Sequence, residues 1–525
     1  MNTDTTDAVK LLTGGRYGRD DFLSLAAAGL FLLAVYGYTL YAGFVSPELI
    51  AAAIVGGYMA LNIGANDVAN NVGPSVGAGA VTLTGALLLA GIFEAAGALI
   101  AGGNVVGTIK SGIIDPSSIN DSNAFIWLMI AALTAGAIWL NLATAIGAPV
   151  STTHSIVGGV LGAGIAAGGW GVANWSAMSS IAASWVISPV LGGLIAAGFL
   201  WWIKRSITYK EDILGAGIKM VPIMVALMTW VFSSYLIVKG LKKIIKIELP
   251  IAVLIGAGIA ILSYFIVKPL IERFAKSQEN NKQAINGMFK IPLIFAAALL
   301  SFAHGANDVA NAVGPLAAIA ETISHGGGST TKAPIPLWVS LIGALGIVVG
   351  LALFGPKLIR TVGSEITELD PMRAFCIGMS AGITVIVASQ LGLPVSSTHI
   401  AVGGVFGVGF LREYLKVNYA KIVQEIREHH QDEEAHVADA FLEKFEAASM
   451  TQKRLMLKEM KREQKAKHIA PLTFSERKAL RKLNKKELVK RSALFKIAAA
   501  WIITVPASAF LAAFVFFAIR GFMLP

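Results

Sequence analysis

The chain reads GANDVANNVGP at residues 64–74 and GANDVANAVGP at residues 305–315, each time inside an apolar stretch. Ten of the eleven positions are identical, and only Asn71 and Ala312 differ. Each copy places one carboxylate at membrane depth, where an ionisable side chain costs at least ~2.5–3.5 kcal/mol and usually faces a partner, an ion or water. The duplication therefore indicates one site built from two halves of the chain.

The composition is that of a membrane protein. Hydrophobic residues make up 55% of the 525 positions and charged residues 14%, whereas soluble proteins carry about 25% charged residues. The apolar runs are long and do not alternate, which predicts helical spans. Basic residues concentrate beside these runs, so the net charge of +11 fits the positive-inside rule better than nucleic-acid binding. The single cysteine, Cys376, excludes an internal disulfide framework.

A second motif is also duplicated, as PVSTTH at residues 149–154 and PVSSTH at residues 394–399. Each copy of this motif follows an acidic motif at a similar distance, so the two motifs belong to one repeated unit. We predict a first copy at residues 48–170 and a second copy at residues 290–412. The other predicted segments are an N-terminal tail with the first span at 1–47, connecting spans at 171–289, a charged helical insert at 413–493, and a last span at 494–525.

The distribution of basic residues orients the two copies. Lys and Arg cluster near residues 204–210, 268–282 and 485–491, which marks these loops and the insert as cytoplasmic. On this basis the chain enters the two acidic motifs from opposite sides of the membrane. The predicted fold is an all-α polytopic membrane protein of about 12 transmembrane helices. It contains two inverted repeats, with broken helices or re-entrant hairpins at the midplane.

The hydroxyl motif predicts an anion site. Proline ends the preceding element, and the following helix start offers unpaired N–H groups, the positive end of the helix dipole and hydroxyls. Ordinary N-capping would explain one copy, but two copies, each paired with an acidic motif, favour binding of a tetrahedral oxyanion. The candidate anion ligands are Ser151, Thr152, Thr153, Ser396, Ser397 and Thr398, together with Asp67 and Asp308.

The acidic motif supplies oxygen ligands for a hard cation such as Na⁺. Residues 48–101, 124–202 and 291–320 contain no Lys or Arg, so a bound dianion needs co-bound cations or protons, which favours cation-coupled symport. A carboxylate can accept the proton of HPO₄²⁻, which sulfate lacks, so phosphate is favoured. The candidate coupling residues are Asn66, Asp67, Asn70, Asn307, Asp308 and Asn311, with Na⁺ placed at Asp67, Asn70, Asp308 and Asn311.

Four further polar residues lie near these motifs. His154 and His399 follow the hydroxyl triplets at matched positions, and they either orient the loop, take part in proton coupling or simply pack between helices. Glu94 lies in the middle of a span and His304 precedes the second acidic motif, where the first copy has Ile63. Glu94, which has no acidic counterpart in the second copy, either bonds helices together or takes part in coupling. Because neither Glu94 nor His304 is matched by an ionisable residue in the other copy, we give both little weight as site residues.

The paired acidic and hydroxyl motifs resemble those of the inorganic phosphate transporter (PiT) family, over both copies. The resemblance implies Na⁺- or H⁺-driven phosphate uptake across a bacterial cytoplasmic (inner) membrane, an inverted-repeat fold and a homodimer. Bacterial members of this kind can carry phosphate as a neutral metal–phosphate complex. The resemblance also implies that the six hydroxyl residues hold phosphate and that the Asp and Asn residues serve both ions. It implies no resident cofactor, and it says little about the insert.

Three alternatives stay open from the residues. A sulfate permease on the same scaffold would use the same helix starts. Asp67 and Asp308 could instead form an intramembrane aspartyl protease dyad, although the duplicated Asn and hydroxyl residues have no task in that chemistry. A plain anion channel would pass phosphate without depending on Na⁺ or pH gradients.

Overall fold

The computed structural model describes residues 19–119, 121–145, 150–240, 247–325, 334–365, 370–428 and 491–523. These residues form helices and no β-sheet, apart from one isolated bridge between Ile114 and Ala173. Eleven helical segments among them are long and apolar enough to cross a membrane. The prediction of an all-helical membrane protein is confirmed, with eleven candidate spans described where about 12 were predicted.

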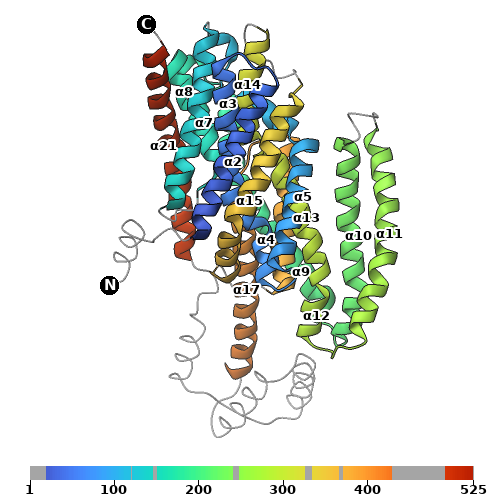
Figure 1. The fold of residues 1–525 in the computed structure, drawn as a ribbon. Helices are drawn as coiled ribbons and strands as arrows, with labels where there is room; N and C mark the ends of the chain where they lie inside the picture. The colour runs from blue at the N-terminus through green and yellow to red at the C-terminus, as the bar shows by residue number, and fades with distance from the viewer. Residues whose placement is uncertain are drawn as a thin grey trace, which may run out of the picture.

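The first copy contributes one group of helices and the second copy a matching group (Figure 1). The first group is α3 (Pro47–Asn66), α4 (Val68–Gly77), α5 (Leu83–Ala101), α6 (Gly103–Gly107), η1 (Thr108–Gly112), α7 (Ser122–Ala145) and α8 (Thr152–Gly168). The second group is α13 (Lys290–Asp308), α14 (Ala310–His325), α15 (Leu337–Glu365), α16 (Pro371–Gln390) and α17 (Ser397–Glu428).

The remaining helices surround or connect these groups. Helix α21 packs on α7 and α8, and α10 and α11 form a hairpin beside the bundle (Figure 1). Helix α17 continues beyond residue 412 as far as Glu428, and the rest of the predicted insert at 413–493 lies outside the described residues. These helices are α2 (Arg19–Tyr41), α9 (Trp175–Ile203), α10 (Ile213–Gly240), α11 (Leu249–Ala275), α12 (Lys282–Met288) and α21 (Arg491–Met523).

Each acidic motif interrupts a helix by a single residue. Asp67 separates α3 from α4, and Val309 separates α13 from α14, yet both keep right-handed helical backbone angles. The predicted break is therefore a local one. Pro74 lies inside α4, seven residues after Asp67, and Pro315 lies inside α14, six residues after Val309. Because proline has no N–H, it deprives the carbonyl four residues earlier of its helical partner, which here is the carbonyl of Asn70 or of Asn311.

The helix that carries each acidic motif packs closely on a helix of the other copy. A Cβ atom on Gly64, the first residue of the first motif, would lie 2.0 Å from the Ile347 carbonyl oxygen on α15. A Cβ atom on Gly305, the first residue of the second motif, would lie 2.1 Å from the Glu94 carbonyl oxygen on α5. Only glycine permits either contact, so each motif helix is fixed against a helix of the other copy.

The outward faces of the peripheral helices are apolar. Leu254 and Phe265 on α11 are 71% and 66% exposed, and Phe510 on α21 is 77% exposed. In water such surfaces would be costly, whereas in a bilayer the acyl chains cover them. By contrast, every residue of the second acidic motif, 305–315, is buried, which places this motif in the interior of the bundle.

Candidate functional site

The two hydroxyl motifs begin helices that meet in the interior of the bundle. The Ser151 hydroxyl accepts the His154 N–H at the start of α8 (3.2 Å), and the Ser396 hydroxyl accepts the His399 N–H at the start of α17 (3.3 Å). The rings of His154 and His399 lie 4.9 Å apart. Ser151 and Ser396 are thus N-caps, and two helix N-termini face one region of the structure.

The hydroxyls of this region bind the acidic motif of the first copy. The Thr152 hydroxyl donates to Asp67 Oδ2 (2.7 Å), and the Thr398 hydroxyl donates to Asp67 Oδ1 (3.2 Å). Thr152 belongs to the same copy as Asp67, whereas Thr398 belongs to the other copy. Both Asp67 oxygens therefore accept hydrogen bonds, one from each half of the chain.

The motif asparagines cross between the copies. Asn70 Nδ2 donates to the Thr398 hydroxyl (2.9 Å), and Asn311 Nδ2 donates to the Thr152 and Thr153 hydroxyls (3.2 Å each). Each asparagine thus donates a hydrogen bond to the last residue of the hydroxyl triplet in the other copy, Thr398 or Thr153. The structure thereby joins six of the twelve predicted site residues in one hydrogen-bonded cluster: Asp67, Asn70, Thr152, Thr153, Asn311 and Thr398.

The other two motif asparagines have more local partners. Asn307 Nδ2 donates to the Ser389 hydroxyl (2.9 Å), and Asn307 Oδ1 accepts the Val395 N–H (3.3 Å), which braces the turn that leads into α17. Asn66 Nδ2 donates to the Asn62 carbonyl on its own helix (3.0 Å). These contacts indicate a bracing role for Asn307, and they do not bring Asn66 into the hydroxyl cluster.

Asp308 has a different environment from Asp67. Its Oδ2 makes an ion-pair contact with His304 Nε2 (2.9 Å) that lacks hydrogen-bond geometry. His304 Nδ1 lies 2.7 Å from Glu94 Oε2, and Glu94 Oε1 accepts a hydrogen bond from Asn71 Nδ2 (2.8 Å). A buried chain of charged and polar groups therefore leads from Asp308 through α13 to α5 and α4.

This chain contains Glu94 and His304, whose connection to the site the sequence pattern did not predict. Both side chains are fully buried, and they meet across 210 positions of sequence. One signal was present in the sequence, because His304 and Asp308 are spaced i, i+4 and must share a helix face. The position of Glu94 could not be read from the sequence, because its contact depends on the crossing at Gly305.

Several buried oxygens of the site have no hydrogen-bond partner among the described residues. They are Asp308 Oδ1, Asn311 Oδ1 and the Ser397 hydroxyl. A carboxylate, a neighbouring histidine and a second carboxylate also approach one another, because Asp67, His304 and Asp308 each offer an atom within 4.8 Å of the others. Unsatisfied buried oxygens beside two carboxylates suit a hard cation, so the donor set fits Na⁺.

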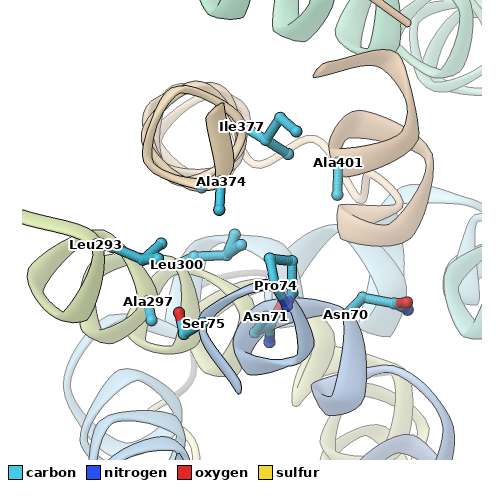
Figure 2. A pocket seen from close by; sticks show the side chains of 11 residues that line it. Asn70, Asn71, Pro74, Ser75, Leu293, Ala297, Leu300, Ala374, Ile377 and Ala401 are labelled. Carbon is cyan, nitrogen blue, oxygen red and sulfur yellow. The ribbon is translucent and has the colours of Figure 1, made fainter. Parts of the chain in front are cut away.

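A small cavity reaches the site from one side. It has a volume of about 10 Å³, close to the room that one water molecule requires. Figure 2 shows it between α4, α13, α16 and α17, with Asn70 and Pro74 at its wall. Asn70 also donates to Thr398, and both are less buried than Asp67 and Thr152. The cavity therefore approaches the hydroxyl cluster through the Asn70–Thr398 side.

Comparison with known proteins gives a consistent result. Residues 63–512 match the family model described as "Phosphate transporter family". The chain is 52% identical to a Helicobacter pylori protein over 96% of both chains, and 38% identical to a Pyrococcus abyssi protein over 72% of this chain and 93% of the other. Both carry the name "putative phosphate permease". A solved structure described as "The sodium-dependent phosphate transporter" is 31% identical, with a TM-score of 0.73 over 91% of this chain and 100% of the other.

Proposed function

The chain belongs to the phosphate transporter family, and on that premise we propose that it imports inorganic phosphate across the cytoplasmic membrane by symport with Na⁺, through alternating access. As a member of this family it is a transport protein and not an enzyme. The aspartyl protease alternative is therefore not retained. The prediction of the family from the paired motifs is confirmed.

The observation that carries the proposal is the sharing of hydroxyls between Asp67 and the anion site. Thr152 and Thr398 now donate to Asp67, and both lie at the starts of helices α8 and α17. A phosphate bound at these helix starts would compete with Asp67 for the same donors. Asp67 would then lose its hydroxyl donors and would need a cation as partner. Binding of the anion and binding of a cation would therefore be linked.

Na⁺ is the favoured coupling ion. Asp308 Oδ1 and Asn311 Oδ1 are buried oxygens without a hydrogen-bond partner in the described part of the chain, and proline releases the carbonyls of Asn70 and Asn311 from their helices. Oxygen ligands of this kind suit Na⁺. The related protein of known structure is itself described as sodium-dependent. The Glu94–His304–Asp308 chain supports H⁺ as the second candidate.

In this proposal phosphate is held by hydroxyls of both copies. Thr152, Thr153 and Thr398 belong to the cluster, and the Ser397 hydroxyl is buried without a partner among the described residues. Ser151 and Ser396 cap the two helices that begin there. The cation side is formed by Asp67, Asn70, Asp308 and Asn311. Sulfate is the second candidate anion, and acceptance of the HPO₄²⁻ proton by an aspartate is the reason to prefer phosphate.

Uptake into proteoliposomes tests the proposal. Purified protein is reconstituted, and labelled phosphate uptake is measured with a Na⁺ gradient, with a pH gradient and with neither. We expect accumulation with the Na⁺ gradient and competition by arsenate. Equal flux without either gradient would support the anion channel, and competition by sulfate but not arsenate would support the sulfate permease.

Three further properties are proposed from the family resemblance: assembly as a homodimer, location in a bacterial inner membrane, and carriage of phosphate as a metal–phosphate complex. Light scattering of the detergent-solubilised protein tests the first, and fractionation of a native host's membranes tests the second. For the third, uptake is measured with and without a divalent-metal chelator. Unchanged uptake in the presence of chelator would exclude a requirement for the complex.

A further inference from the structure

We propose that α6 and η1, residues 103–112, form the outer gate of the transport pathway and that the ion pair between Lys110 and Glu321 holds this gate shut. We call residues 103–112 the strap. The inference rests on the proposed transport function, because a gate is meaningful only in a protein that moves its ligand across a membrane.

The ion pair is short and buried. Lys110 Nζ lies 2.5 Å from Glu321 Oε2, and the two side chains are 3% and 9% exposed. Removing both charges from water is costly, and only close contact offsets that cost. Loss of Glu321 would leave the buried Lys110 charge without this partner, so the pair favours the state in which the strap and α14 are in contact.

The strap belongs to the first copy but is attached to the second. Helix α14 carries Glu321, and α14 also accepts the strap at Gly314, where a Cβ atom would lie 2.7 Å from Ile109 Cγ2. Two hydrogen bonds reach the end of α16 and the turn that follows it. They run from Thr108 Oγ1 to the Gly392 carbonyl (2.7 Å) and from Asn104 Nδ2 to the Gln390 carbonyl (3.1 Å).

The strap packs on two segments that adjoin the site. Gly314 belongs to the second acidic motif and lies six residues after Asp308, so Ile109 packs within two helical turns of the candidate cation ligands. Gly392 precedes the second hydroxyl motif. Movement of the strap would therefore uncover α14 and the turn before α17 together.

The position of the strap relative to the cavity assigns it to the outer side. The cavity is lined by Asn70, Pro74 and Ser75 of α4, together with residues of α13, α16 and α17 (Figure 2). Figure 1 places α14 at the end of the bundle away from α12 and the lower end of α17, where the predicted cytoplasmic loops lie. The site is thus closed by the strap on one side and adjoins a cavity on the other.

The strap also has an unusual backbone. Residues 108–112 form a π-helical turn directly after the short helix α6. Such turns are rare and occur frequently at functional sites. Lys110, the positively charged partner of the ion pair, lies on this π-helical turn.

The experiment measures access to the strap in intact cells. Cys376 is replaced by alanine, and Ile109→Cys is introduced as a reporter on the buried side of the strap, which packs on α14. A membrane-impermeant maleimide added outside the cells then labels the reporter only when the outer side opens. This readout does not require phosphate transport.

Removal of the ion pair should open the strap. We expect Lys110→Gln to raise the labelling rate at least about tenfold, because the variant loses the charged contact between the strap and α14. The charge-swapped K110E/E321K pair should return the rate to within about threefold of the parent, because it restores the contact. Lys110→Arg, which keeps the charge, should also stay near the parent rate.

A matched control is the exposed pair of Lys268 and Glu272, 4.0 Å apart and 43% and 44% exposed. Lys268→Gln removes one positive charge, as Lys110→Gln does, and should leave labelling unchanged. Equal labelling of Lys110→Gln and the parent overturns the gate, and so does an equal rise in Lys268→Gln. If the charge-swapped protein does not elute as a single species, Lys110→Arg decides: fast labelling of that variant also overturns the gate.

Phosphate uptake separates this inference from the proposed function. If the parent protein accumulates no phosphate in proteoliposomes but labelling depends on Lys110, the proposed transport function fails while the strap remains a charge-latched segment. If the parent accumulates phosphate but labelling is indifferent to Lys110, the gate fails alone.

Discussion

The two copies share almost identical acidic motifs, yet their aspartates lie in different chemical environments. Asp67 accepts hydrogen bonds from two hydroxyls, whereas Asp308 contacts His304 and has one oxygen without a partner among the described residues. The difference comes from outside the ten shared positions, because Ile63 stands where the second copy has His304. A duplicated motif therefore fixes where the carboxylates lie, and single-copy neighbours decide what each carboxylate can bind.

The one motif position that differs between the copies has a structural explanation. Asn71 of the first copy donates to Glu94, and its counterpart in the second copy is Ala312. Glu94 then contacts His304, which contacts Asp308. Asn71, the residue at which the first motif differs from the second, is thus connected through Glu94 and His304 to Asp308 of the second motif.

Loss of either aspartate should have the largest effect. We expect Asp67→Asn and Asp308→Asn each to lower Na⁺-driven phosphate uptake at least about 100-fold, since either change removes a buried charge that the cation would pair with. Uptake is measured in proteoliposomes of equal protein content, with the exposed Asp121→Asn as control. Full accumulation by either variant, eluting as the parent does, would contradict the assignment.

Replacing His304 by isoleucine tests the asymmetry directly, because it gives the second copy the residue of the first. We expect uptake to fall about 30-fold, because Glu94 and Asp308 lose the group between them and remain buried. Adding Glu94→Gln should restore part of the loss, with a coupling energy of about 1–3 kcal/mol in the double-mutant cycle. Strictly additive losses would show that the three residues do not act together.

A smaller effect is expected when Asn71 is changed to alanine, the residue of the second copy. The variant deprives Glu94 of one hydrogen bond, and bonds to charged groups contribute about 1.5–3 kcal/mol. Uptake should fall about tenfold, and melting in detergent should occur at a lower temperature. The matched variant Ala312→Asn introduces the asparagine into the second copy instead. It should not restore the uptake that Asn71→Ala loses, because the second copy has no acidic residue at the position of Glu94.

The smallest effect is expected for exchanges of hydroxyl residues between the copies. Thr152→Ser and Ser397→Thr keep a hydroxyl at each position, so we expect uptake within about threefold of the parent. Thr152→Val, which removes the donor to Asp67, should be much weaker than Thr152→Ser. Similar activity of these two variants would show that the hydrogen bond to Asp67 is not used.

The fold and the centre of the site could be predicted from the sequence because both are duplicated. Long apolar runs predicted helical spans, and two pairs of motifs predicted one composite site. The structure joins Asp67, Asn70 and Asn311 to the predicted hydroxyls, as expected of a composite site. Asp308, Asn307 and Asn66 make other contacts, with His304, with Ser389 and with the Asn62 carbonyl, respectively.

Contacts between residues that occur in only one of the two copies could not be predicted in the same way. The Glu94–His304 contact and the Lys110–Glu321 ion pair each join residues that are more than 200 positions apart. No periodicity or repeated spacing links such residues, so only the packing of α5 on α13 and of the strap on α14 reveals them. The helix interruptions at Asp67 and Val309 are also smaller than the motif suggested, because the backbone there remains helical.

The hydrogen bonds of Asp67 have a consequence for how the protein is made. Thr152 follows Asp67 by 85 residues, but Thr398 follows it by 331. At the usual rate of synthesis, about 5–20 residues per second, the second partner leaves the ribosome roughly 17–66 s after the aspartate. Thr152 is itself made 85 residues after Asp67, so until Thr398 is made the chain contains at most one of the two hydroxyl partners of Asp67. Insertion machinery must therefore accommodate an unfinished polar site until the last third of the chain arrives.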